Sequence, residues 1–181
     1  MFVNMFSNFV YQTKLNIDNK SIIKICKQES LNPSDHNQVD LPDHILLKPL
    51  LQKINDHVKI VSKKMGYHDK IKPVCVRSWI NSNNAKEIIE PHLHPNVQLA
   101  CVYYPLADEN VSVIKFINPV QQVQYAIESK KIVDWNEYNS TAWTVNPITN
   151  GLIIFPAWLL HYVVGKNVSE RMSIAFNYIL K

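Results

Sequence analysis

Two histidines separated by one residue stand in the stretch Glu90-Pro91-His92-Leu93-His94-Pro95-Asn96. In an extended strand, side chains two positions apart point to the same side, about 6.6 Å from one another, so His92 and His94 would aim their imidazoles at a common point. A third histidine, His161, follows much later, after a turn and at the start of an apolar run typical of a strand. Three ligands from two strands would leave coordination positions open for substrates, which is how proteins use iron or zinc as a reagent.

A His-x-His pair alone is weak evidence for a metal site. Such pairs also occur on exposed strands and as hydrogen-bonded histidines of a core. The surroundings of the pair must therefore decide between these readings. The remaining histidines fall outside the strand pattern and are expected on the surface; they are His36, His44, His57 and His68.

The first third of the chain predicts supporting elements rather than the site itself. Aromatic and β-branched residues over 8–15 indicate an opening strand, and a short helix follows that Asp18 or Asn19 can cap. The next twenty or so residues, which contain Pro33, Ser34, Asp35 and Pro42, predict a loop. Apolar residues at three-and-four spacing predict an amphipathic helix over 48–65.

Beyond Gly66 the pattern changes to short apolar runs separated by turn residues, with a weak helical period only around 120–128. Many short strands of this kind are typical of a sandwich or a barrel. We therefore expect a mainly β protein with N-terminal helices, whose core is an antiparallel double-stranded β-helix, a cupin-like jelly-roll barrel. The predicted strands of this core are residues 74–81, 98–104, 111–116, 152–155 and 171–178.

Length and composition fit one domain over residues 1–181, with the opening strand and supporting helices in about 1–70 and the barrel in about 72–181. The chain has 181 residues, of which 46% are hydrophobic and 19% charged, and it shows no repeat or linker. Its formal net charge of +4 is spread along the sequence, which argues against a nucleic-acid partner.

The three cysteines, Cys26, Cys75 and Cys101, have no paired spacing and stand in apolar surroundings, as buried reduced thiols do. Nowhere does the sequence run through about 18 consecutive apolar residues, so we expect no membrane partner. Together these features predict a cytoplasmic protein. They leave a homodimer open.

The order of motifs along residues 72–180 resembles a family of iron(II)- and 2-oxoglutarate-dependent oxygenases common in bacteria and marine phages. Any one of these motifs is a weak signal, but together they are specific. The motifs are Trp79-x-Asn81, His92-x-His94-Pro95-Asn96, Val102-Tyr103-Tyr104, Ile114-x-Phe116-x-Asn118-Pro119, Gly151-Leu152-Ile153-Ile154-Phe155-Pro156-x-Trp158-Leu159-x-His161 and Arg171-x-Ser173-Ile174-x-Phe176-Asn177.

The resemblance implies iron(II) held by three side chains, with positions left for 2-oxoglutarate and dioxygen. His92 matches the first ligand of the family and His161 the distant one. His94 stands where the superfamily usually has a carboxylate, and this departure would give the iron one more unit of positive charge. Glu90 stays open as the alternative ligand, since it precedes His92 by two positions.

The resemblance also implies a binding site for the co-substrate. Arg171 matches the arginine that pairs with the distal carboxylate of 2-oxoglutarate, because a guanidinium fork suits a carboxylate. Ser173 faces the same way two residues later. Tyr104 and Asn81 are further candidates, with core packing as the alternative for both.

The activity implied is oxidative decarboxylation of 2-oxoglutarate to succinate and carbon dioxide, coupled to hydroxylation of a second, unidentified substrate. Phe155 and Trp158 would wall the metal off from water. Residues 121–150, with Trp135, Tyr138 and Trp143, would cover the barrel mouth and select the substrate.

Two other classes of function remain open from the residues alone. One is a three-histidine, cupin-like iron dioxygenase that does not use 2-oxoglutarate, in which Arg171 would have no task. The other is a non-enzymatic jelly-roll binding module with incidental histidines. Fold cannot separate them, because jelly rolls carry all three functions.

Overall fold

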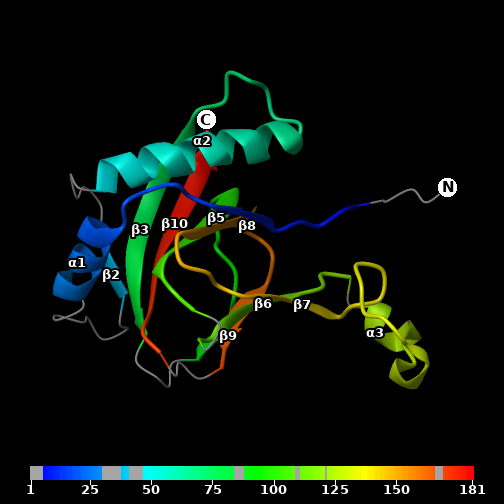
Figure 1. Ribbon diagram of the computed structural model, residues 1–181. Coiled ribbons are helices and arrows are strands. Elements are labelled where there is room, and N and C mark those ends of the chain that lie inside the picture. Colours follow the sequence, from blue (N-terminus) through cyan, green and yellow to red (C-terminus); the bar gives the residue numbers. More distant parts are fainter. Residues whose placement is uncertain are drawn as a thin grey trace.

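The computed structural model describes residues 6–29, 38–40, 47–83, 88–108, 111–120, 122–165 and 169–181. In this part of the chain, two antiparallel sheets have the strand orders β1-β8-β5-β10-β3-β2 and β4-β9-β6-β7 (Figure 1). The strands are β1 (Tyr11–Lys14), β2 (Gln38–Asp40), β3 (Pro73–Asn83), β4 (Ile89–His92), β5 (Leu99–Leu106), β6 (Val113–Ile117), β7 (Ala142–Val145), β8 (Gly151–Pro156), β9 (His161–Val164) and β10 (Arg171–Leu180). The helices are α1 (Lys20–Glu29), α2 (Lys48–Lys64) and α3 (Val123–Ala126), with a 3₁₀ turn at Ser129–Lys131.

The six-stranded sheet is covered on one face by the two N-terminal helices. Apolar side chains of α1 and α2, such as Ile25 and Ile54, share a buried cluster with Ile174 and Phe176 of β10. Side chains alternate across a strand, so the intervening β10 residues point to the opposite face. The helices therefore cover one face of this sheet, and the second sheet lies on the side of the other face, as Figure 1 shows.

A second core fills the space between the two sheets. Tyr104 and Phe155 of the six-stranded sheet pack in one buried cluster with Ile114, Phe116 and Val163 of the four-stranded sheet. Central strands buried on both sides explain the nearly unbroken apolar runs of β5 and β8. The functional side chains described below lie in or beside this second core.

Helix α2 begins and ends where its sequence predicts. A proline stands in its first turn, where a missing N–H costs no helical hydrogen bond. Lys63 and Lys64 in its last turn interact favourably with the negative end of the helix dipole. Gly66 has φ +86°, a conformation that glycine adopts without a steric penalty and that ends the helix.

Most of the predicted elements lie where expected, and two strands were missed. The strand β2 falls in the stretch predicted as a loop, of which the other residues lie outside the described ones. It forms because β3 offers it a free edge, with Gln38 opposite Asn81. The strand β7 was missed because four residues at a sheet edge, three of them exposed, give no clear alternation. The helix expected around 120–128 is the four-residue α3.

None of the described helices has both the length and the apolar character required to cross a membrane.

The packing of α2 on the sheet makes a testable prediction. Ile54 is fully buried, whereas Ile60 on the same helix is 54% exposed. We expect Ile54→Ala to lower the free energy of unfolding by about 2–5 kcal/mol, because it removes buried methyl groups and leaves a cavity. The control, Ile60→Ala, should change it by less than about 0.5 kcal/mol. Urea unfolding followed by circular dichroism measures both; equal losses would contradict the described packing of the helix.

Candidate metal centre

Two of the three histidines are brought together by strand pairing. The strands β4 and β9 are antiparallel neighbours, and His92 lies directly opposite His161. Directly opposed residues point to the same face of a sheet, about 5 Å apart. The register of β4 against β9 therefore makes neighbours of two histidines that are distant in sequence.

The third histidine is placed by a turn and not by a strand. Because β4 ends at His92, the expected alternation along a single strand does not position His94, which is a correction to the sequence-based prediction. The N–H of His94 donates to the carbonyl of Ala157 at 2.8 Å, which ties this segment to the turn before β9. Asn96, with φ +63°, then reverses the chain toward β5.

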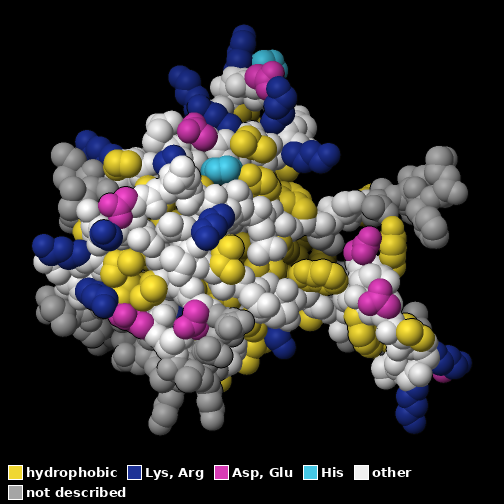
Figure 2. Space-filling view, in the orientation of Figure 1, with side chains coloured by type: hydrophobic (Ala, Val, Ile, Leu, Met, Phe, Trp, Pro, Cys, Tyr) yellow, Lys and Arg dark blue, Asp and Glu magenta, His cyan; other side chains and the backbone are white. Residues whose placement is uncertain are grey.

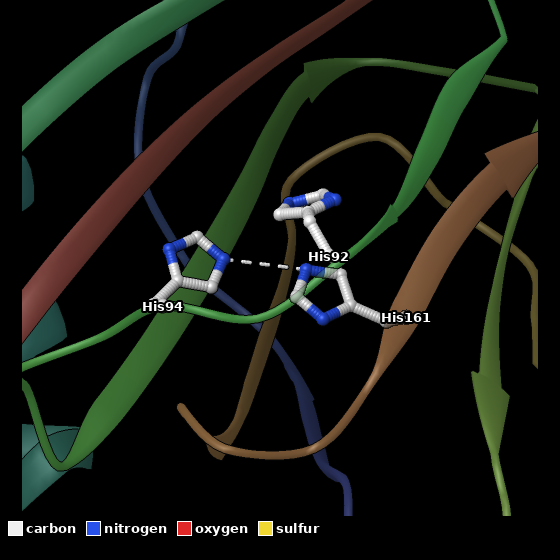
Figure 3. Close-up of side chains that lie close together, drawn as sticks. All are labelled: His92, His94 and His161. Atoms are coloured by element: carbon white, nitrogen blue, oxygen red, sulfur yellow. Dashed lines mark hydrogen bonds between the residues drawn. The ribbon is translucent and has the colours of Figure 1, made fainter.

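The ligand nitrogens of His92, His94 and His161 all lie within 4.8 Å of one another (Figure 3). The Nε2 atoms of His94 and His161 are 3.3 Å apart, and their rings are parallel within 2°. Nitrogens about 2.1 Å from one ion and at right angles stand about 3 Å apart. The three imidazoles thus converge on a space of the size that one metal ion occupies.

Backbone carbonyls orient two of these rings. Nδ1 of His92 donates to the carbonyl of Glu90, and Nδ1 of His161 to the carbonyl of Leu159, each at 2.8 Å. A carbonyl only accepts hydrogen bonds, so the proton of each neutral ring must sit on Nδ1. Nε2 then carries a lone pair, which is the form of imidazole that binds a metal.

Burial keeps His94 and His161 neutral. It lowers the pKa of His94 to about 4, with a further contribution from His92. It lowers the pKa of His161 to about 3, an effect that the hydrogen bond to Leu159 partly opposes. At neutral pH both rings are therefore uncharged, so a metal would not have to displace the extra proton of an imidazolium.

The alternative ligand, Glu90, lies differently. Among the described residues, the group of side chains able to hold a metal ion consists of the three histidines. The side chain of Glu90 is exposed, and its contribution to the site is the backbone carbonyl that orients His92.

Aromatic rings surround the histidines. Trp79 stacks on His94 with ring centroids 5.8 Å apart, and Phe155 meets the ring of His161 edge-on at 4.7 Å. Phe155 is fully buried, as expected of a wall beside a metal. Trp158 is 53% exposed, which corrects its prediction as a second wall; it lies in the turn after β8, where the strand alternation no longer applies.

The four residues expected to bind a co-substrate share one face of the six-stranded sheet. Ser173 of β10 lies opposite Asn81 of β3, and both strands turn these residues away from the helices. Arg171, Ser173 and Tyr104 are 3%, 1% and 1% exposed. The guanidinium carbon of Arg171 lies 5.3 Å from the centre of the Tyr104 ring, so a buried cation and a buried phenol stand side by side.

Two buried hydroxyls lie on this face beside Arg171. The hydroxyl groups of Tyr104 and Ser173 are both buried; that of Ser173 is among the described hydroxyls without a hydrogen-bond partner, whereas that of Tyr104 interacts with the guanidinium of Arg171. Leaving such a group unsatisfied costs free energy, so in a folded protein it calls for an explanation such as a ligand. Burial raises the pKa of Tyr104, and the charge of Arg171 opposes this rise. Asn81 differs, because its Oδ1 accepts a hydrogen bond from Nε1 of Trp79 at 3.1 Å.

The other histidines were all expected on the surface, and those that the structure describes differ in their exposure. His57 is not a surface residue: it is partly buried, and its Nδ1 lies 2.8 Å from the hydroxyl of Tyr11. His68 is exposed, as predicted. His36 and His44 lie outside the described residues. The structure also shows what the motifs did not indicate, namely the ring of Trp79 on His94 and the carbonyls that orient His92 and His161.

Comparison with known proteins finds one matching family and several similar folds. A family model with the description "Putative 2OG-Fe(II) oxygenase" matches residues 77–177. No curated protein shows significant sequence similarity to the chain.

Solved structures show the same fold at low sequence identity. A prolyl-4-hydroxylase from Pseudomonas putida is 11% identical, with a TM-score of 0.63, and the match covers 96% of this chain and 93% of that one. HygX from Streptomyces hygroscopicus, solved with nickel and 2-oxoglutarate bound, is 8% identical, with a TM-score of 0.57 and coverages of 94% and 82%. The epimerase SnoN in complex with Fe³⁺, alpha ketoglutarate and nogalamycin RO is 11% identical, with a TM-score of 0.57 and coverages of 95% and 79%.

The lowered pKa values make the stability of the metal-free protein depend on pH. Below the ordinary histidine pKa of 6.5, the unfolded chain takes up protons at His94 and His161, whereas the folded chain does so only near pH 4 and 3. The stabilisation is thus complete above pH 6.5 and is lost as the pH falls toward these values. Between pH 6.5 and 5 we expect a loss on the order of 1–3 kcal/mol from the two groups.

Urea unfolding in the presence of a chelator, at several pH values from 7 to 5, measures this loss. The matched variant is His94→Gln with His161→Gln, which keeps two polar side chains but removes both titrating groups. Its stability should depend less steeply on pH than that of the wild type. Identical slopes would mean that the folded protein also takes up these protons.

Proposed function

Because the chain belongs to the 2OG-Fe(II) oxygenase family, whose enzymes are oxidoreductases that use iron(II) and 2-oxoglutarate, we propose that it is a dioxygenase that hydroxylates a second substrate. In this proposal His92, His94 and His161 hold the iron. The observation that carries it is the convergence of three imidazoles, two of them held in the tautomer whose Nε2 carries a lone pair.

Bound iron(II) supplies the reaction of 2-oxoglutarate with dioxygen, which yields succinate and carbon dioxide and places one oxygen atom in a C–H bond of the second substrate. The residues of this chain supply the surroundings for that chemistry. The carbonyls of Glu90 and Leu159 hold two imidazoles in the ligand tautomer. The rings of Phe155 and Trp79 keep water away from the histidines.

Arg171, Tyr104 and Ser173 bind the distal carboxylate of 2-oxoglutarate in this proposal. The buried guanidinium matches a carboxylate in charge and in its planar fork, and two buried hydroxyls stand beside it. This cluster favours 2-oxoglutarate dependence over a three-histidine dioxygenase that uses no co-substrate, in which these groups would have no function. Asn81, whose oxygen is held by Trp79, lines the same face and positions its neighbours.

We assign the two sheets to a double-stranded β-helix, with β4 and β9 as its metal-binding strands and residues 1–181 as one domain. The match of nearly the full length of both chains to the Pseudomonas putida structure supports this assignment. The buried free thiols of Cys26 and Cys101 are compatible with a reducing, cytoplasmic environment.

The metal ligands can be tested by single substitutions. His92→Ala and His161→Ala should each weaken manganese(II) or iron(II) binding by about a hundredfold or more, because each removes one of three ligands. His94→Ala should weaken binding more than Glu90→Ala. His68→Ala, which removes an exposed histidine, is the control and should leave the affinity unchanged.

Calorimetric titration of the metal under argon measures these affinities, with far-ultraviolet circular dichroism to verify folding. Wild-type affinity in folded His92→Ala and His161→Ala would refute the metal site. A larger effect for Glu90→Ala than for His94→Ala would move the second ligand to Glu90.

The role of Arg171 can be tested separately from that of the metal. Arg171→Ala should leave metal binding nearly unchanged but weaken 2-oxoglutarate by about 2–5 kcal/mol, or roughly thirty- to several-thousand-fold. Arg171→Lys should restore part of the affinity, because an ammonium keeps the charge and loses the fork. Ser173→Ala, a milder change, should weaken binding by about 1 kcal/mol.

The measurement is a titration of iron-loaded protein with 2-oxoglutarate under argon, followed by the visible charge-transfer band of a chelated keto acid. Equal affinities in all four proteins would remove Arg171 and Ser173 from the co-substrate site. The absence of binding to the wild type would refute the dependence on 2-oxoglutarate.

A further inference from the structure

A groove opens between the N-terminal segment and the segment that carries α3, at the side where β1 and β7 form the edges of their sheets. Figure 2 shows this hollow, with hydrophobic side chains around it. Its volume is about 610 Å³, within the range of small-molecule sites. The groove thus has the size to admit a small molecule.

The groove is continuous with the row of side chains that contains the metal ligands. Across the four-stranded sheet, His92 lies opposite His161, His161 opposite Phe116, and Phe116 opposite Trp143. Opposed residues share a face, so these four rings form one row from the candidate metal centre to the edge strand β7. Phe116 and Trp143 line the groove, and the Phe116 ring centre is 5.8 Å from that of His161.

Leu159 makes a second connection between groove and metal centre. This residue lines the groove, and its carbonyl accepts the hydrogen bond from Nδ1 of His161. Phe116 and Leu159 therefore form the inner end of the groove, directly beside the histidines. The three histidines do not themselves line the groove, so a molecule lying against Phe116 and Leu159 would be one side chain away from the candidate metal centre.

We propose that this groove, which we call the β1–β7 groove, binds the hydroxylated substrate and that this substrate is a small, uncharged molecule with a hydrophobic ring or chain. The proposal rests on the proposed function, since it assigns the second substrate of the same reaction. Trp143 is the specificity-determining residue at the groove's outer end, and Phe116 positions the substrate beside the metal centre.

The chemistry of the lining supports an uncharged, hydrophobic substrate. The walls are mostly apolar or aromatic, with Val10 on one side and Trp143 and Val145 on the other. Among the described residues that line the groove, Glu137 is the charged one, and no lysine or arginine is present. An anionic substrate would therefore lose its hydration without gaining a cationic partner.

A second tryptophan, Trp135, lies close to Trp143 in the sequence and provides a control. Trp135 and Trp143 are 48% and 49% exposed, and both follow α3 in the chain. Trp143 lines the groove, whereas Trp135, which was expected from the sequence to help select the substrate, does not. Removing either ring takes away a similar exposed aromatic surface, so a difference between the two variants reports on the groove itself.

The test uses the neutral fluorescent probe N-phenyl-1-naphthylamine with the full chain. We expect the probe to bind the wild type, Trp143→Ala to weaken it by about fivefold or more, and Trp135→Ala to leave it unchanged. The anionic analogue 8-anilinonaphthalene-1-sulfonate has the same rings and should bind more weakly than the neutral probe. Equal losses in both variants, no binding of the neutral probe, or tighter binding of the anion would each overturn the proposal.

A second measurement places the probe relative to the metal. In protein loaded with manganese(II), proton relaxation of the bound probe should be strongly enhanced, and the enhancement should fall when Trp143→Ala releases the probe. Probe binding without enhancement, in protein that does bind manganese, would overturn the inference and leave the metal centre intact. Failure of manganese to bind the wild type would refute the proposed function instead.

The oligomeric state tests a different occupant of the groove, a second copy of this chain. Size-exclusion chromatography should show the same elution for wild type, Trp143→Ala and Trp135→Ala. A dimer that dissociates only in Trp143→Ala would assign the groove to self-association and overturn the substrate proposal.

Discussion

The pairing of β4 with β9 is the constraint on which the site depends. It sets His92 opposite His161, and the same backbone supplies the carbonyls of Glu90 and Leu159 that fix both rings. Rotamer freedom is thereby removed before a metal arrives, so its binding need not include the entropic cost of ordering these side chains. A one-residue slip in this register would turn one histidine to the opposite face of the sheet.

Strand alternation gives each strand of the larger sheet two separate tasks. On β10, Ile174 and Phe176 pack under the helices, while Arg171 and Ser173 point into the space between the sheets. Burial of the apolar face stabilises the fold, and this stabilisation offsets the cost of burying a guanidinium and two hydroxyls on the other face. A rigid sheet is a better support for these groups than a loop, because their spacing is set by backbone hydrogen bonds.

The sequence predicted the parts of this structure that follow from local pattern. The amphipathic stripe of α2 and the apolar runs of β5, β8 and β10 indicated their elements, because burial on a regular backbone has a fixed period. The grouping of His92, His94 and His161 also followed from motif order. The sequence pattern did not predict features that depend on tertiary contacts. The strand β2 forms through its pairing with β3, and a backbone hydrogen bond to Ala157 positions His94. The hydrogen bonds to the backbone carbonyls of Glu90 and Leu159 could not be predicted, because any residue type supplies the same carbonyl group.

In the proposed site, a third imidazole in place of a carboxylate would change the electrostatics as a whole. With three neutral ligands, bound iron(II) keeps both of its positive charges, and Arg171 adds another buried cation on the facing sheet. Arg77, close enough to contribute after burial and His92 to the lowered pKa of His94, adds to the positive potential. 2-Oxoglutarate carries two negative charges, so it supplies the counter-charge that a carboxylate ligand would otherwise provide in part. Metal and co-substrate should therefore bind cooperatively: each is held more tightly in the presence of the other, by the same free energy.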